Sequence, residues 1–97
     1  MTKQEEFKKA IKNNKVDVVK DLLKNENIKP FFLDNWAICY TSAHSYIEII
    51  KVLLQDSRID PSIRDNKPIY DAATKGHTDV VQLLLQDKRV NNSTSIN

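Results

Sequence analysis

The sequence is short of glycine, cysteine and long apolar runs, and each shortage excludes a class of protein. Gly76 is the only glycine among 97 residues, whereas β-hairpins and phosphate-binding loops normally need several. Cys39 is the only cysteine, so no internal disulfide can form, and with no export signal we expect a reducing, cytoplasmic setting. No apolar run approaches the roughly 20 residues that cross a bilayer, so no membrane partner is expected.

The composition is that of one ordinary globular domain, which we expect to span residues 1–97. Apolar residues make up 40% of the chain and charged residues 29%, a balance that does not fit a disordered chain. The net charge of +2 is too small to argue for a nucleic-acid partner. The eight lysines of residues 1–30 are spread around a helical wheel, which indicates a solvated surface and leaves nucleic-acid binding as a third alternative.

The strongest pattern is an internal repeat of 31 residues. The segments 17–23, 48–54 and 79–85 read DVVKDLL, EIIKVLL and DVVQLLL, and their first residues are 31 apart (48 − 17 and 79 − 48). Their apolar residues follow the i, i+1, i+4, i+5 spacing of one helical face. The same offset aligns Ile28, Ile59 and Val90, and also Phe7, Ile38 and Ile69. The predicted repeats are about 4–34, 35–65 and 66–91, followed by a polar tail at 92–97.

Each copy reads as two short helices joined by a turn. In the third copy Pro68 stands near the expected start of the first helix, Asp65 or Asn66 is available as its cap, and Gly76 ends it. The first helices of the pairs are predicted at 4–13, 36–44 and 67–75, and the second helices at 16–25, 47–56 and 78–87. The connectors 27–35 and 58–66 contain proline and are expected to be extended. Such pairs bury their apolar faces only by stacking.

Residues 68–85 read PIYDAATKGHTDVVQLLL, which resembles the ankyrin repeat signature TPLHxAAxxGH followed by VVxLLL. The resemblance covers about residues 4–91 and implies an all-α, ankyrin-type helix-turn-helix repeat solenoid. The repeats are two residues shorter than the usual length of about 33, so we expect short connectors in place of the family's β-hairpin fingers. The resemblance also implies that His77 makes a structural hydrogen bond to a neighbouring turn. A tetratricopeptide-like array is the rival, but it lacks a polar, proline-containing connector between pairs.

The residues offer no arrangement for catalysis. Cys39 and His44 lie five positions apart on one predicted helix, about 140° around its axis, so they should not meet. Two histidines and one cysteine without paired spacing do not make a zinc site. The carboxylates fall in turns or first helical turns, where none forms an isolated apolar pair. We therefore expect no enzyme activity, no cofactor and no metal.

The resemblance implies a protein partner that binds the concave face of the first helices and the connector tips. The function predicted on this basis is a protein-protein interaction module, an adaptor or inhibitor scaffold. The candidate partner-binding residues are Phe31, Phe32, Leu33, Trp36, Tyr40, His44, Ile63, Arg64, Asn66, Asp71, Thr74 and Lys75.

Two questions stay open in the sequence. The cluster from Phe31 to Trp36 is either an exposed interaction site or a cover that closes the core of the first repeat. The alternative function is a structural role, in which copies stack end to end or self-associate weakly through the C-terminal repeat. Val80, Leu83 and Leu84 would then form an open apolar end.

Overall fold

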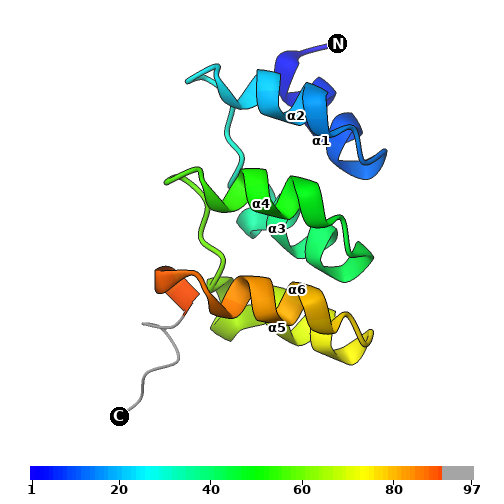
Figure 1. The fold of residues 1–97 in the computed structure, drawn as a ribbon. Coiled ribbons are helices and arrows are strands. Elements are labelled where there is room, and N and C mark those ends of the chain that lie inside the picture. Colours follow the sequence, from blue (N-terminus) through cyan, green and yellow to red (C-terminus); the bar gives the residue numbers. More distant parts are fainter. Residues whose placement is uncertain (91–97) are drawn as a thin grey trace.

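The computed structural model describes residues 1–90, which form three stacked pairs of helices (Figure 1). The pairs are α1 (Lys3–Lys12) with α2 (Val16–Leu23), α3 (Phe32–His44) with α4 (Ile47–Leu54), and α5 (Ile63–Thr74) with α6 (Thr78–Leu85). No strand occurs within the described residues. The prediction of an all-α helix-turn-helix repeat fold is therefore confirmed. The polar tail predicted at 92–97 lies outside the described residues.

The core is continuous through the three repeats and depends on contacts between neighbours. Val18, Ile49 and Val80 occupy the same position of successive repeats. Ile49 and Val80 are completely buried, whereas Val18 is 44% exposed. This position faces the preceding repeat, and Val18 has no described repeat before it. Burial of each such side chain contributes about 1.5–3 kcal/mol, so each added repeat stabilises the one beside it.

The first helix of every pair ends at a residue with left-handed backbone geometry. These residues are Asn14, Ser45 and Gly76, with φ angles of 56°, 59° and 76°. In each copy the following amide reaches back to a helix carbonyl, as His77 does to Ala72 at 2.9 Å. This is the hydrogen bond of a Schellman ending, which needs a left-handed residue. The role predicted for Gly76 is confirmed.

The expectation that the connectors are extended is wrong. Leu33, Asp34 and Asn35 have φ angles of 55°, 55° and 60° and form a short left-handed turn that leads into the right-handed part of α3. Residues 64–66 repeat this geometry before α5. With two residues fewer than a usual ankyrin repeat, the chain makes this turn in place of an extended finger. Asp and Asn fill two of the three positions in both copies, and both tolerate this conformation well.

The sequence suggested Asn66 as a possible helix cap. Asn35, at the same position of the second repeat, has a different role. Its Oδ1 accepts a hydrogen bond from the backbone amide of Asp60 at 2.8 Å. Gln4 stands at the same position of the first repeat, and its Oε1 accepts from the amide of Lys29 at 2.9 Å. In both repeats, a side chain near the start of the first helix therefore binds the backbone of the connector at the end of the same repeat.

An arginine ties the second repeat to the first. The Nη1 of Arg58 donates to the carbonyl of Ile28 at 2.8 Å, and its Nη2 donates to the carbonyl of Leu23 at 2.9 Å. The Asp56 carboxylate holds the guanidinium from the other side, at 2.7 Å from Nη2. The guanidinium thus binds the carbonyl of the last residue of α2, which a helix leaves without an internal partner, and a second carbonyl in the connector that follows.

The third repeat uses the same arginine clamp. Arg89, 31 positions after Arg58, donates to the carbonyls of Ile59 and Leu54 and pairs with the Asp87 carboxylate. In the first repeat the position of the arginine is held by Asn27. The clamp is therefore present only where the described chain has a preceding repeat to bind.

Replacement of Arg58 by alanine is expected to lower the free energy of unfolding by roughly 2–3 kcal/mol, because charge-assisted hydrogen bonds to partly buried carbonyls are lost. Urea unfolding followed by circular dichroism measures the loss. The control is Lys51→Ala, which removes only the exposed 3.4 Å pair with Glu48 and should change stability by no more than about 0.5 kcal/mol. Equal midpoints for Arg58→Ala and the wild type would contradict the clamp.

The clamp also predicts how stability depends on pH. The hydrogen bond from Arg58 holds the pKa of Asp56 below its ordinary value of 3.8. A carboxyl with a lower pKa in the folded state adds stability above the unfolded pKa and loses it as the pH falls through the folded pKa. In urea titrations, the midpoint difference between the wild type and Asp56→Asn should be largest near neutral pH and shrink below pH 3.8. A difference that stays constant down to acid pH would argue against this pair.

Candidate partner-binding surface

Four aromatic rings follow one face of α3 at intervals of four residues. They are Phe32, Trp36, Tyr40 and His44, here called the aromatic stripe. The centroids of Phe32 and Trp36 lie 6.2 Å apart, those of Trp36 and Tyr40 4.8 Å apart, and Tyr40 stacks on His44 at 4.0 Å. Trp36, Tyr40 and His44 lie on the right-handed part of α3, where residues four apart are neighbours on the helix surface. Phe32 precedes the left-handed turn that leads to Trp36. The middle repeat therefore presents a nearly continuous row of rings.

The residue immediately before α4 and the one immediately before α6 each bind the preceding repeat. Tyr46 lies 5.5 Å from His44 by ring centroids, and its hydroxyl donates to the carbonyl of Lys12 at 3.5 Å. His77, 31 positions later, bonds through Nε2 to the carbonyl of Ala43 at 3.0 Å. Because a carbonyl oxygen only accepts, this nitrogen carries the hydrogen. The bond that the ankyrin resemblance implies for His77 is present.

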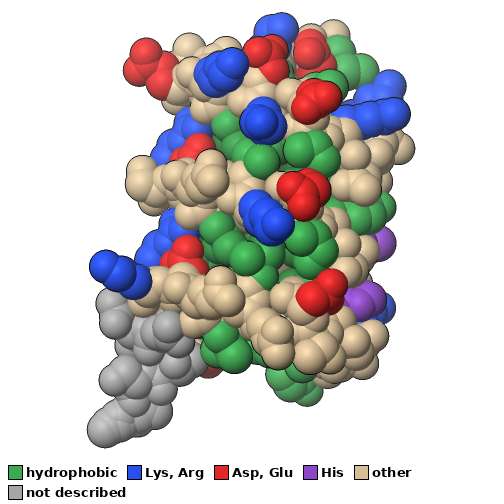
Figure 2. All heavy atoms as spheres, in the orientation of Figure 1, with side chains coloured by type: hydrophobic (Ala, Val, Ile, Leu, Met, Phe, Trp, Pro, Cys, Tyr) green, Lys and Arg blue, Asp and Glu red, His purple; other side chains and the backbone are tan. Residues whose placement is uncertain are grey.

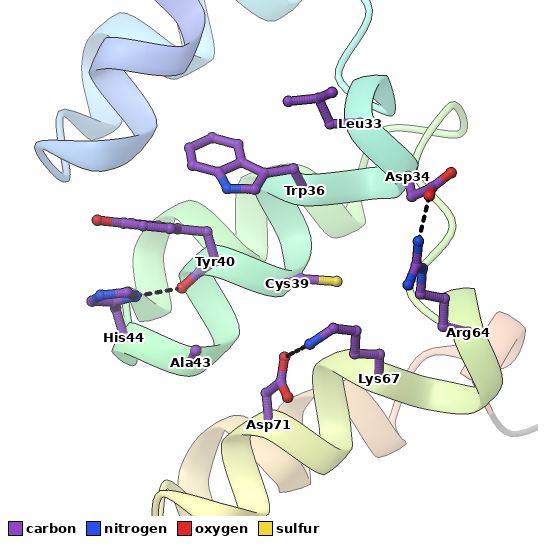
Figure 3. Close-up of a pocket in the computed structure, with 10 residues that line it drawn as sticks. All are labelled: Leu33, Asp34, Trp36, Cys39, Tyr40, Ala43, His44, Arg64, Lys67 and Asp71. Atoms are coloured by element: carbon purple, nitrogen blue, oxygen red, sulfur yellow. Dashed lines mark hydrogen bonds and ion pairs between the residues drawn. The ribbon is translucent and has the colours of Figure 1, made fainter.

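A groove of about 270 Å³ lies beside the aromatic stripe, between α3 and α5 (Figure 3). Its apolar wall comes from α3 and is formed by Leu33, Trp36, Cys39, Tyr40 and Ala43. Figure 3 shows Cys39 and His44 pointing to opposite sides of α3. The groove is open and mostly apolar on one side, which is the character of a site for a partner side chain.

The facing wall of the groove is charged and internally paired. Lys67 Nζ lies 2.6 Å from the Asp71 carboxylate along α5, and Arg64 Nη2 lies 2.6 Å from the Asp34 carboxylate across the two repeats. The hydrogen bond to Asp71 raises the pKa of Lys67. Both cations of this wall are therefore already partly neutralised before a partner binds.

The structure brings half of the sequence-predicted site residues together around the groove. Those that line it are Leu33, Trp36, Tyr40, His44, Arg64 and Asp71. Those that do not are Phe31, Phe32, Ile63, Asn66, Thr74 and Lys75.

Four groove residues were missing from the predicted site: Asp34, Cys39, Ala43 and Lys67. A usable signal existed for Lys67, because it stands four residues before Asp71, the spacing of an ion pair on a helix. Lys67 also takes the position of Trp36 in the next repeat. Asp34 gave no such signal, since its partner Arg64 comes from the next connector.

The sequence left open whether the cluster from Phe31 to Trp36 is an exposed interaction site or a cover over the core. In the structure, part of the cluster does each. Phe32 and Trp36 are half-buried and pack against the core. Phe31 and Leu33 are 43% and 63% exposed. The cluster therefore covers part of the core and also presents apolar surface at the mouth of the groove.

The open apolar end expected from Val80, Leu83 and Leu84 is wrong for two of the three residues. Val80 and Leu84 are completely buried, and Leu83 is half-buried. Val80 faces the preceding repeat as Ile49 does, and Leu84 lies within its own pair as Leu53 does. These positions are therefore covered without any second copy.

The outer helices present a different kind of surface. On the face in Figure 2, basic and acidic side chains lie side by side over α2 and α4, and hydrophobic patches lie in the furrows between repeats. The helix α6 carries Asp79 but no lysine or arginine. The furrow between α2 and α4 is lined by Lys20, Leu23, Lys24, Val52, Gln55 and Asp56. This furrow contains no aromatic side chain. The face formed by the first helices of the pairs, α1, α3 and α5, is therefore the better candidate for a contact surface.

Stacked helical pairs with short connectors define a helix-turn-helix repeat solenoid. The family model described as ankyrin repeats (3 copies) matches residues 7–95, and the chain belongs to the ankyrin repeat family. Comparison with curated proteins and with solved structures gives no match. Ankyrin repeats are in general protein-protein interaction modules and non-catalytic binding scaffolds.

Residues 1–90 contain no group of three His, Cys, Asp or Glu side chains that could hold a metal ion. None of the helices in this range is both long enough and apolar enough to span a bilayer.

Cys39 offers a chemical probe of the groove. Burial raises the pKa of its thiol from 9.0 to about 11, so at pH 8 the reactive thiolate is roughly a hundredfold scarcer than in an exposed cysteine. Modification by dithionitrobenzoate should therefore be about a hundredfold slower in the folded protein than in urea, and should accelerate as the pH rises toward 11. Equal rates in the folded and unfolded chains would contradict the burial of this thiol.

Proposed function

We propose that the protein is an adaptor or inhibitor scaffold that binds a protein partner through the groove and the aromatic stripe. The observation that carries this proposal is the comparison between repeats. Trp36, Tyr40 and His44 are replaced by Lys67, Asp71 and Lys75 at the same positions of the third repeat. The first repeat has Glu5, Lys9 and Asn13 there. Two repeats fold with polar residues at these positions, so folding alone does not require the rings.

The composition of the stripe supports a contact role. Tryptophan and tyrosine are enriched among the residues that dominate interface energies. Trp36 and Tyr40 are half-buried, so they are held in place by the core while part of each ring remains accessible. Side chains fixed in this way lose little conformational freedom on binding.

Leu33 adds an independent argument. Its side chain is 63% exposed, and its backbone φ is 55°. A leucine in the left-handed region is strained, and an exposed leucine gains little from burial. The turn itself requires the left-handed backbone, as Arg64 shows with a φ of 53° at the same position of the next repeat. It does not require an exposed leucine there, which is understandable if the side chain contacts a partner at the mouth of the groove.

End-to-end stacking of copies has less support. A repeat that stacks on the C-terminal end would supply an arginine to the carbonyls of the repeat before it, as Arg58 and Arg89 do. The first repeat of a second copy carries Asn27 at that position. Its side chain is too short to form the clamp.

The variant Leu33→Asn separates binding from folding. Asparagine adopts left-handed geometry more easily than leucine, so the melting temperature should stay the same or rise. Capture of a partner from an extract of the cell that makes the protein should fall by roughly fivefold, the effect of losing about 1 kcal/mol. Calorimetry and quantitative pull-down measure the two quantities.

The matched control is Leu85→Asn, which removes another exposed leucine, from the end of α6 and away from the groove. It should capture the partner as the wild type does. Undiminished capture by Leu33→Asn, or equal loss in both variants, would refute the groove as the contact surface.

A further inference from the structure

We infer that the groove takes an acidic segment of a protein partner that carries one bulky apolar side chain. This inference rests on the proposed function and adds the chemistry of the partner. It comes from the charges that surround the aromatic stripe and from the size and lining of the groove beside it.

Lysines flank the aromatic stripe on its N-terminal side. The Nζ of Lys8 lies 5.9 Å from the centroid of the Trp36 ring. Lys9 and Lys12 occupy, on α1, the positions that Tyr40 and Ala43 occupy on α3. All three lysines belong to the helix that packs against α3 from the N-terminal side. The backbone carbonyl of Lys12 accepts a hydrogen bond from the Tyr46 hydroxyl, and Lys9 is exposed and also lines a hollow with Glu6 and Asn13.

Another lysine lies on the opposite side of the stripe. Lys75 follows α5 at the position that His44 holds in the middle repeat. Within residues 1–90, the lysines in none of the ion pairs include Lys8, Lys9, Lys12 and Lys75. Their charges are available to a partner.

The acidic groups on the same face are largely engaged. Asp34 pairs with Arg64, and Asp71 pairs with Lys67, each at 2.6 Å. The Glu5 carboxylate accepts a hydrogen bond from the amide of Thr2 at 2.8 Å, where it closes the capping box of α1. The balance of charge around the groove is therefore positive, and acidic residues are complementary to it.

The groove itself selects an apolar side chain. Its volume of about 270 Å³ is below the range of about 300–1,000 Å³ typical of sites for whole small molecules. It suits one large side chain, such as leucine or phenylalanine, inserted between α3 and α5. Leu33, Cys39 and Ala43 form its apolar wall, and the two cations of the facing wall, Arg64 and Lys67, are paired with Asp34 and Asp71. The acidic residues of the segment would lie outside, toward the lysines.

A single-stranded nucleic acid would also be attracted by lysines and aromatic rings, but the geometry favours a peptide. Bases bind by stacking on exposed ring faces. Here the Tyr40 face is stacked on His44 with an angle of 17° between the planes, and Lys8 lies over the Trp36 ring. The carboxylates of Asp34 and Asp71 in the groove wall would also repel phosphates.

The test uses the fluorescence of Trp36, the only tryptophan in the chain, during titration of the whole protein. The probe is the acetylated, amidated peptide DEELFDEE, which offers leucine and phenylalanine as two alternatives for the single apolar position in the groove. A peptide of equal charge, DEESSDEE, lacks the apolar anchors and should bind at least about tenfold more weakly. The basic peptide KRKLFKRK should not bind. Raising the salt from 50 to 300 mM should weaken the acidic peptide several-fold.

The double variant Lys9→Gln/Lys12→Gln should weaken binding of DEELFDEE by about fivefold. The matched variant Lys20→Gln/Lys24→Gln removes two exposed lysines at the α2–α4 furrow and should bind as the wild type does. Circular dichroism melts of both variants check that the fold is unchanged, which these exposed positions lead us to expect.

Absence of DEELFDEE binding at millimolar peptide overturns the inference, as does equal binding of DEESSDEE or equal loss in the two lysine variants. Tighter binding of an eight-nucleotide oligouridylate than of DEELFDEE also overturns it, in favour of nucleic acid. The proposed function is judged separately by the Leu33→Asn pull-down. A partner that is lost in that experiment but carries no acidic segment would uphold the function and refute this chemistry.

Discussion

The structure depends on the burial of each helical pair against its neighbour. The positions of Ile49 and Val80 are completely buried because a repeat precedes them, while Val18 at the same position is partly exposed. The arginine clamps add polar bonds between the same repeats, since each binds the carbonyl of the last residue of the preceding helix, Leu23 or Leu54. Apolar burial and hydrogen bonding therefore act between the same pairs of repeats, which is the energetic pattern of a solenoid.

Most of the architecture can be predicted from the sequence, because the three copies can be aligned with one another at a fixed offset. The 31-residue offset predicts the three helical pairs and the left-handed ending at Gly76. It does not reveal the left-handed turn at residues 33–35, because a short polar segment with proline fits an extended chain equally well. Nor does it reveal the clamp of Arg58, whose acceptors are backbone carbonyls 30 and 35 residues earlier. Backbone acceptors have no residue type and so leave no trace in a sequence.

The candidate site was only partly predictable, for a related reason. A family resemblance identifies the face that is used but not the side chains that meet there. The four rings of the stripe were among the predicted residues because they fall in the connector and on the concave face that the resemblance implies. The wall from α5 was found less completely, because Arg64 and Asp34 lie 30 residues apart and meet only through stacking. The aromatic residues of the middle repeat are visible when the three copies are aligned in the sequence, but the groove beside them is visible only in space.

The direction of the clamps has a consequence for how the chain is made. Every clamp arginine follows its acceptors in the sequence, so Arg58 leaves the ribosome after Leu23 and Ile28, and Arg89 leaves after Leu54 and Ile59. Each new repeat can thus dock on backbone that has already been synthesised. The growing polypeptide never needs a later segment to complete an earlier clamp, and assembly can keep pace with translation from the N-terminal end.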